Sequence, residues 1–246
     1  SLRLQAFGVT EPDAGSDTMR IKTFAKKVGG KYVINGQKIF TSRFQHSDML
    51  LLITRTTPFE QAKKKTDGMT LFLIDLKEAG DAVKAQPIKT MINHETNQLF
   101  IDNLEVSENA RIGEEGKGFP YLMGSLAAGR ISHAGRSVGI SQAAYDASVK
   151  YAQERVQFGQ PIGKFQAIAF KVANMATELE AARWLTYRAA WLYDQKRPCM
   201  KEASMCKLFA SEVAILATNE AMQIHAGYGY MMESPVQRYF RDARLY

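Results

Sequence analysis

The chain has 246 residues, 46% of them hydrophobic and 23% charged, which is enough for one large domain or two smaller ones with buried cores. No apolar run reaches the roughly 18 residues that a membrane-spanning helix needs, so we expect no membrane span. The 32 Lys and Arg residues exceed the 25 Asp and Glu residues, but they are scattered apart from Lys63 to Lys65. This pattern favours an ordinary basic surface over a nucleic-acid site or an anionic ligand.

The cysteines and the first residues bear on the cellular compartment. Cys199 and Cys206 lie seven residues apart in a helical stretch with no His nearby to complete a zinc site, so we interpret them as free buried thiols in a reducing compartment. Residues 1–6 contain no charged stretch followed by an apolar one, so we expect no secretory signal. No pair of His residues has the spacing of metal ligands, and His94 is expected to lie in a polar turn.

Residues 4–113 alternate short β-like runs with turn residues. The dipeptides Gly29-Gly30, Asn35-Gly36 and Asp67-Gly68 lie beside these runs and supply the positive φ that tight turns need. We therefore predict an antiparallel sheet domain in this half of the chain. Its strands are expected at residues 31–34, 49–55, 69–76 and 98–101.

From about residue 118 the hydrophobic pattern changes to a helical period. Apolar residues repeat at intervals close to three and four and predict the buried faces of two helices. These residues are Ile168, Val172, Met175 and Leu179, and later Leu208, Val213 and Leu216. We predict a helical bundle with helices at residues 118–154, 164–195, 199–226 and 234–244.

The first of these helices is unusual because Gly124, Gly129, Gly135 and Gly139 lie inside it. Each glycine costs up to about 1 kcal/mol relative to alanine in a helix interior. Two explanations fit this pattern: close packing of a second helix, or a flat ligand or thin chain lying on that face. The sequence leaves both open.

Two turn-rich segments carry the clearest chemical pattern. Residues 7–17 read FGVTEPDAGSD, where the hydroxyls of Thr10 and Ser16 suit the edge of a heteroaromatic ring or an anion, and equally suit caps of turns. Residues 35–42 read NGQKIFTS, where a turn leads into a strand that ends in an aromatic ring and two hydroxyls. Such an end suits one face and a nitrogen of a ring cofactor, or it places Phe40 in the core.

Further motifs follow in the helical half, and together with these two segments they resemble the acyl-CoA dehydrogenase superfamily from residue 4 to residue 246. The specific elements are TEPxAGSD, ERxxFGxPI and GxG in this order. They occur here at residues 10–17, 154–162 and 227–229. The resemblance implies an α+β fold, in which an antiparallel β-barrel-like domain (residues 1–115) that binds flavin and acyl-CoA is followed by a four-helix bundle (residues 116–246) that binds FAD and forms the oligomer.

By resemblance the cofactor is FAD, with the isoalloxazine on the sheet domain and the pyrophosphate between Ser16 of one subunit and the bundle residues Arg155, Gln157 and Phe158 of the other. Thr10 is expected to bond the pyrimidine edge, Phe40 stands where many relatives have Trp, and Ser42 corresponds to a hydroxyl near N5. Without the resemblance, Arg155 is equally well explained as a surface charge, and Gly227 as the C-cap of a helix. The full expected set is Phe7, Val9, Thr10, Ser16, Phe40, Thr41, Ser42, Arg155, Gln157, Phe158, Gln166, Gln223 and Gly227.

The resemblance also implies a reaction in which a carboxylate removes the α-proton of an acyl-CoA thioester while a hydride passes from the β-carbon to flavin N5. In most members the base follows the RDAR motif, here residues 241–244, and would lie beyond Tyr246; a minority place it at the position of Gly129. Because glycine has no side chain, we assign no catalytic base. Substrate contacts are expected at Ser16 and Arg130, and Ala127 stands where some relatives have an Asp that contacts the pantetheine.

The resulting expectation is an FAD-dependent acyl-CoA dehydrogenase of fatty acid metabolism. It would pass electrons to an electron-transfer flavoprotein and form a homotetramer or homodimer, in a bacterial cytoplasm or the mitochondrial matrix. The family also has an N-terminal helical domain, so we expect this chain to be a piece of a longer protein.

Two alternatives stay open. Ala127 and Gly129 are compatible with an acyl-CoA oxidase, a nitroalkane oxidase or a flavin monooxygenase of the same fold. A non-catalytic, DNA-associated flavoprotein is the other alternative, because one branch of the superfamily protects against DNA alkylation and this chain is basic. No basic helix or interleaving of basic and aromatic residues supports nucleic-acid binding.

Overall fold

The computed structural model describes residues 3–92 and 95–246, so His94 lies outside the described residues. The chain divides into two compact units, the first ending at Gly124 and the second beginning at Ser125. The domain boundary expected between residues 115 and 116 stays a prediction.

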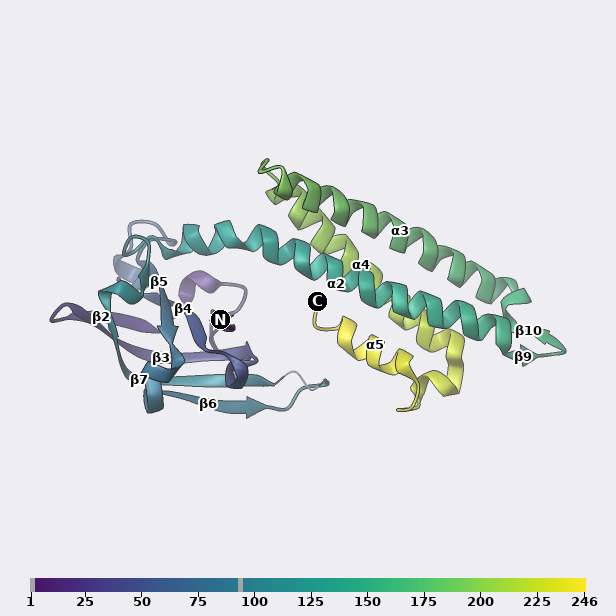
Figure 1. The fold of residues 1–246 in the computed structure, drawn as a ribbon, viewed down its shortest axis with the longest axis horizontal. Coiled ribbons are helices and arrows are strands. Elements are labelled where there is room, and N and C mark those ends of the chain that lie inside the picture. Colours follow the sequence, from purple (N-terminus) through teal and green to yellow (C-terminus); the bar gives the residue numbers. More distant parts are fainter. Residues whose placement is uncertain (1–2, 93–94) are drawn as a thin grey trace. The chain divides into compact units, whose positions relative to one another are not determined.

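The first unit is built around one mixed sheet (Figure 1). Its strand order is β6-β7-β3-β2-β4-β5-β8, and β1 pairs with β4 beside this path. A short helix, α1 (Leu76–Ala79), follows β5. The strands are β1 (Gln5–Gly8), β2 (Phe24–Val28), β3 (Lys31–Ser42), β4 (Met49–Arg55), β5 (Met69–Asp75), β6 (Val83–Ile88), β7 (Thr96–Ser107) and β8 (Arg111–Ile112).

The predicted antiparallel pairing is confirmed for most neighbouring strands, and β4 provides the exceptions. It pairs in parallel with β1 and, at Phe24 and Arg55, with β2. Parallel neighbours need a crossover connection, and the β2–β3 hairpin lies in the chain between β1 and β4. Tyr32, Leu52 and Phe72 are fully buried in the core of this unit, where burial of apolar surface stabilises the sheet.

The turn predicted at Asn35-Gly36 is wrong, because both residues lie inside β3. The turn predicted at Gly29-Gly30 is confirmed: it connects β2 and β3, with φ of +56° and +81°. Gly36 marks a register shift between β3 and β7, and a Cβ built on it would lie 2.6 Å from the Thr23 Cα. A glycine is needed there because another backbone approaches it closely.

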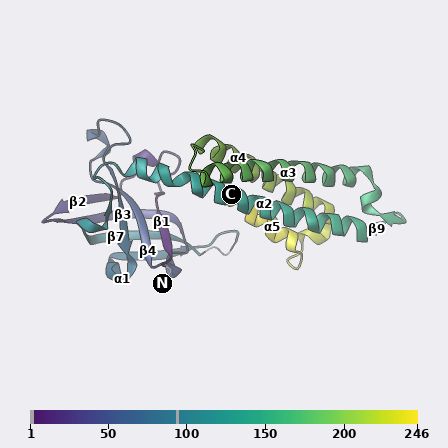
Figure 2. The same cartoon turned by 45° about the horizontal axis from the view of Figure 1, so that its top comes forward.

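The second unit is helical, and the four predicted helices are confirmed to within two residues at each end. A small hairpin of β9 (Val156–Gln157) and β10 (Gln160–Pro161) follows α2. Helices α3 and α4 run next to each other in both views of the chain (Figure 2). The helices are α2 (Gly118–Glu154), which begins in the first unit, α3 (Gln166–Asp194), α4 (Met200–His225) and α5 (Pro235–Ala243).

The buried face of α4 differs from the prediction. Val213 is buried as expected, but Leu208 is 60% exposed and Leu216 is 41% exposed. The core side of α4 carries small residues instead, including Ala210, which packs in one cluster with Ala182 of α3 and other small side chains. Alanine lets helices approach closely, so the leucines are left on the outer side. Within the described residues, no helix is long and apolar enough to cross a membrane.

Candidate functional site

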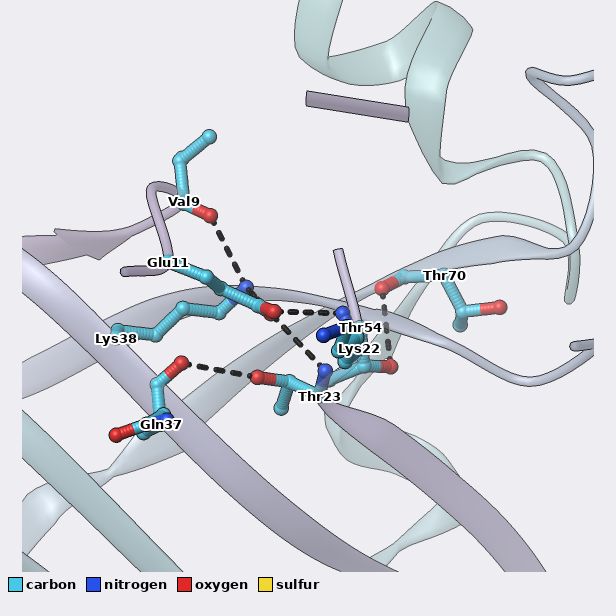
Figure 3. A network of polar contacts seen from close by, with 8 residues as sticks. All are labelled: Val9, Glu11, Lys22, Thr23, Gln37, Lys38, Thr54 and Thr70. Carbon is cyan, nitrogen blue, oxygen red and sulfur yellow. Dashed lines mark hydrogen bonds and ion pairs between the residues drawn. The ribbon is translucent and has the colours of Figure 1, made fainter. Parts of the chain in front are cut away.

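The segment after β1 is fixed to β3 by three polar contacts, and Figure 3 shows the two that Lys38 makes. The Ile39 N–H donates a hydrogen bond to the Thr10 carbonyl at 2.9 Å. The Lys38 ammonium donates to the Val9 carbonyl at 3.0 Å and lies 2.8 Å from Glu11 Oε1. These contacts bring together the two motif segments, residues 7–17 and 35–42, that are far apart in the sequence.

Glu11 and Lys38 form a buried ion pair, with side chains 5% and 0% exposed. The Glu11 carboxylate also accepts the backbone N–H of Lys22 at 2.6 Å and that of Thr23 at 3.0 Å. Burial raises the pKa of Glu11, but Lys38 and these donors outweigh it and leave the pKa below its ordinary value. Burial lowers the pKa of Lys38 to about 8, against the opposing effect of Glu11, so the pair is ionised at neutral pH.

Phe7 and Phe40, one from each segment, are exposed aromatic residues, at 48% and 63%. Phe40 is therefore not a core residue. Its φ is +59°, a conformation that costs a non-glycine residue on the order of 1–3 kcal/mol, and it lies at a register shift between β3 and β7. Ser42 is exposed as well.

Thr41 lies on the opposite side of the strand and is 1% exposed, so it does not share the exposed face of Phe40 and Ser42. Its Oγ1 has no hydrogen-bond partner within the described residues. Burying an unbonded hydroxyl is costly, which makes this atom a point where a ligand or water would be stabilised.

The cap interpretation of Ser16 finds no support. The short helical turn Thr18–Arg20 begins after Asp17, and its N-cap makes no side-chain hydrogen bond. Thr18 Oγ1, not Ser16, donates to the Gly15 carbonyl at 3.0 Å. Ser16 is exposed beside this turn, and Thr10 is half-buried.

In the helical unit, five of the expected cofactor residues line one cavity of about 730 Å³. The cavity lies where the end of α2, the β9–β10 hairpin and the end of α4 meet, and its wall is mostly apolar. A cavity of this size with a few polar groups is typical of a ligand site. The five residues are Arg155, Gln157, Phe158, Gln223 and Gly227.

Aromatic rings organise the wall of this cavity. The guanidinium of Arg155 lies 5.6 Å from the centre of the Tyr228 ring. The ring of His225 stacks on Tyr151 with 4.3 Å between centroids, and its Nδ1 lies 2.8 Å from the Ala221 carbonyl oxygen. Burial lowers the pKa of His225, so the imidazole is neutral at pH 7 and acts as a packed helix-end residue.

Two expected cofactor residues, Phe158 and Gln166, lie at or next to this cavity. Phe158, with φ of +52°, is 92% exposed, and its ring lies 6.0 Å from that of Phe165. Gln166 is the exposed first residue of α3, adjacent to Phe165, which lines the cavity. A Cβ built on Gly227 would meet nothing within 4 Å, so the cavity leaves open space at this backbone.

Of the expected substrate residues, Ser16 lies in the sheet unit and Arg130 lies on α2. Arg130 is half-buried, and its Nη1 is 2.8 Å from the Met200 sulfur. Ala127 is buried and packs on Leu192, Cys199 and Ala203, so it belongs to the bundle core. Nothing described lies within 4 Å of a Cβ built on Gly129, Gly135 or Gly139, which disfavours packing of another helix of this chain as the reason for these glycines.

Two residues of the candidate site could not be identified from sequence motifs. Lys38 is one, although the alternation of Tyr32, Ile34 and Lys38 on the inner face of β3 is a signal that a charge is buried there. Tyr151 is the other; it lies on α2, four residues before Arg155, and lines the same cavity.

Cys199 and Cys206 are free and buried, as predicted. Among the residues described, no cluster of three or more His, Cys, Asp or Glu side chains suits a metal ion.

Comparisons with known proteins identify the family of both units of the chain. Residues 6–104 match the family described as "Acyl-CoA dehydrogenase, middle domain", and residues 116–246 match "Acyl-CoA dehydrogenase, C-terminal domain". An acyl-CoA dehydrogenase of Bacillus subtilis is 43% identical over 98% of this chain and 63% of its own length. The caffeyl-CoA reductase-Etf complex subunit CarC of Acetobacterium woodii is 41% identical over the same two shares.

Among solved structures, the butyryl-CoA dehydrogenase of Megasphaera elsdenii superimposes with a TM-score of 0.93 at 38% identity, covering 99% of this chain and 63% of that one. The chain thus spans 63% of the length of these three relatives. The two domain matches cover most of the chain in the order found here, so the chain belongs to the acyl-CoA dehydrogenase family.

Proposed function

We propose that this chain forms the flavin- and thioester-binding part of an FAD-dependent acyl-CoA dehydrogenase. The observation that carries the proposal is the cavity of about 730 Å³, around which the fold gathers Arg155, Gln157, Phe158, Gln223 and Gly227 from two separate segments. Residues from separate segments around one cavity are what a ligand site requires.

The residues of the helical unit fit the diphosphate end of FAD. Arg155 supplies a guanidinium that binds phosphate oxygens in pairs, and Gln223 adds amide donors. The open space at Gly227 allows a dinucleotide to approach the backbone closely. Phe158 and Gln166 extend this set, and Ser16 of a neighbouring subunit is proposed to add a hydroxyl.

The residues of the sheet unit fit the ring end of the cofactor. Phe7, Val9 and Phe40 supply apolar surface for a flat ring, while Thr10 and Ser42 supply hydroxyls for its edge. Thr41 is buried, so its place in the set depends on its unbonded Oγ1 alone. The orphaned hydroxyl and the exposed aromatic rings are both compatible with a bound isoalloxazine.

When bound, the flavin supplies the two-electron oxidant for α,β-dehydrogenation of the thioester. The chain's own residues bind and orient the cofactor, and Ser16 and Arg130 are proposed to contact the acyl-CoA. No residue described here is assigned as the base, because Gly129 has no side chain. The base is proposed to follow Tyr246 in the sequence.

The proposal also covers the electron acceptor, the assembly and the cellular compartment of the protein. The electron acceptor is proposed to be an electron-transfer flavoprotein, since CarC is named as a subunit of an Etf complex. The assembly is proposed to be a homotetramer or homodimer. The free thiols of Cys199 and Cys206 fit a reducing compartment such as a bacterial cytoplasm or the mitochondrial matrix, and the role is proposed to lie in fatty acid metabolism.

The test is the visible absorption spectrum of the purified full-length protein, which includes the segment proposed to carry the base, recorded anaerobically before and after addition of acyl-CoAs of different length and branching. We expect a flavin spectrum that bleaches with one class of thioester. A protein without bound flavin, or a flavin that no acyl-CoA bleaches, would contradict the proposal. Fast oxygen consumption by the reduced protein would identify an oxidase of the same fold instead.

A further inference from the structure

Glu11 and Lys38 form a buried ion pair and lie within two residues, along the chain, of Val9, Thr10 and Phe40 of the proposed ring-binding surface. Lys38 is fully buried and Glu11 nearly so, while their neighbours along the chain, Thr10 and Phe40, are accessible. Figure 3 shows the Lys38 side chain reaching the Val9 carbonyl and the Glu11 carboxylate. A charge buried this completely is expensive unless it is paired and hydrogen-bonded, and here it is both.

The contacts of the pair join three segments. Lys38 comes from β3, Val9 and Glu11 from the segment after β1, and Glu11 in turn accepts the N–H groups of Lys22 and Thr23, which precede β2. The ammonium is therefore fixed by two acceptors, and one of these acceptors is fixed by two backbone donors. Such a network has few alternative arrangements, because any shift leaves a buried polar group unpaired.

Phe40 gives a second reason to look for a rigid support. Its backbone is in the left-handed region at φ +59°, two residues after Lys38, and the strand pairing shifts register between Lys38 and Thr41. A strained residue of this kind persists only when its surroundings hold it in place. Two contacts help to hold the residues just before Phe40: the Lys38 ammonium donates to the Val9 carbonyl, and the Ile39 N–H donates to the Thr10 carbonyl.

We infer that Lys38 is a positioning residue for the flavin: together with Glu11 it locks the Val9–Glu11 segment onto β3, so that Val9, Thr10, Phe40 and Ser42 form one ring-binding surface. This inference rests on the proposed function. Lys38 itself does not contact the cofactor; it acts through the backbone of Val9 and the carboxylate of Glu11.

Four variants of the protein test the inference. Lys38→Met removes the charge and keeps the length of the side chain. The double variant Glu11→Gln with Lys38→Met leaves no unpaired charge, so it keeps the test valid if the single variant folds poorly. Lys38→Arg is the conservative variant. Lys31→Met is the matched control, because Lys31 lies on the same strand but makes an exposed ion pair with Glu105 at 3.3 Å.

Two readouts are needed. The first is the dissociation constant of FAD together with the position of the visible flavin bands. We expect the double variant to bind FAD about tenfold or more weakly with shifted bands, Lys38→Arg to recover part of the affinity, and Lys31→Met to behave as the unmodified protein. The second is amide hydrogen exchange without FAD, where the Ile39 N–H should exchange faster in the Lys38 variants and not in Lys31→Met.

The outcomes separate the inference from the proposed function. If the unmodified protein binds FAD and the folded double variant keeps the same affinity, bands and Ile39 exchange, Lys38 has no positioning role and the inference is overturned alone. If the unmodified protein binds no FAD, the proposed function fails and the inference fails with it. Faster exchange at Ile39 with unchanged flavin binding would reduce Lys38 to a structural residue and also overturn the inference.

Discussion

At the scale of single residues, Arg155 carries much of the proposed ligand recognition in the helical unit. It lines the cavity as a half-buried cation, and its guanidinium lies against the ring of Tyr228. We expect Arg155→Met to weaken FAD binding by roughly 10- to 100-fold, because a hydrogen bond to a charged group contributes about 1.5–3 kcal/mol. The measurement is FAD titration followed by flavin fluorescence.

Arg238→Met is the control for this substitution. Arg238 lies 5.5 Å from the Tyr239 ring in a similar contact, but it is exposed on α5 and does not line the cavity. Its replacement should leave FAD affinity unchanged. Equal losses in both variants would show that positive charge in general, and not Arg155, attracts the cofactor.

The buried ammonium of Lys38 predicts a pH dependence of stability. Its pKa is about 8 in the folded protein against 10.5 for the ordinary side chain. Between these values the unfolded chain binds more protons than the folded one, so linkage makes Lys38 increase the free energy of unfolding as the pH rises from about 8 to about 10.5. Below that window Lys38 is protonated in both states and contributes no slope.

Urea titrations of the unmodified protein and of Lys38→Met at several pH values measure this effect. We expect the difference in unfolding free energy to shift in favour of the unmodified protein above about pH 8 and to stay constant between about pH 6 and pH 7. A difference that is independent of pH throughout would mean that the ammonium keeps an ordinary pKa in the folded state.

At the scale of elements, helix α2 carries glycines that its own chain does not use for packing. A Cβ added at Gly135 or Gly139 meets nothing within 4 Å. We expect Gly135→Ala and Gly139→Ala each to raise the free energy of unfolding by about 0.5–1 kcal/mol, because alanine has the better helix propensity. Thermal and urea unfolding of the purified protein measure the change.

Gly36→Ala provides the opposite case for comparison. It should destabilise the protein, since a Cβ there would lie 2.6 Å from the Thr23 Cα and the glycine has φ +150°. If Gly135→Ala or Gly139→Ala also destabilises the assembled protein, then another subunit or a ligand lies on this face of α2. That result would answer the question that the sequence left open.

At the scale of the complete chain, the net charge of +7 is the observation behind the alternative that the protein binds nucleic acid. Some of the basic residues form ion pairs, such as Lys27 with Glu108 and Lys171 with Glu220. We expect no binding of labelled duplex DNA at about 150 mM salt, measured by fluorescence anisotropy. Tight binding that weakens steeply with added salt would revive the DNA-associated alternative.

Sequence patterns predict the bounds of the helices well, but they mislead at Asn35-Gly36 in β3 and at the leucines of α4. The helices lie close to their predicted bounds because the change to a helical period and the turn residues between helices mark where each one begins and ends. Asn35-Gly36 was misread because a glycine required by the close approach of Thr23 looks the same as a glycine required by a turn. The α4 leucines were misread because the pattern does not tell which face an alanine-rich helix buries.

The two halves, the order of the helices and the family motifs can be predicted from the amino-acid sequence, because periodicity, turn chemistry and motif spacing are properties of neighbouring residues. Three features could be found only in the folded chain: Arg155 and Gln223 share a cavity, Thr41 faces the interior while Phe40 faces outward, and Lys38 binds Glu11. The physical reason is that burial and pairing depend on which distant segments meet, and the charge of Lys38 is tolerated in the core only because those segments do meet.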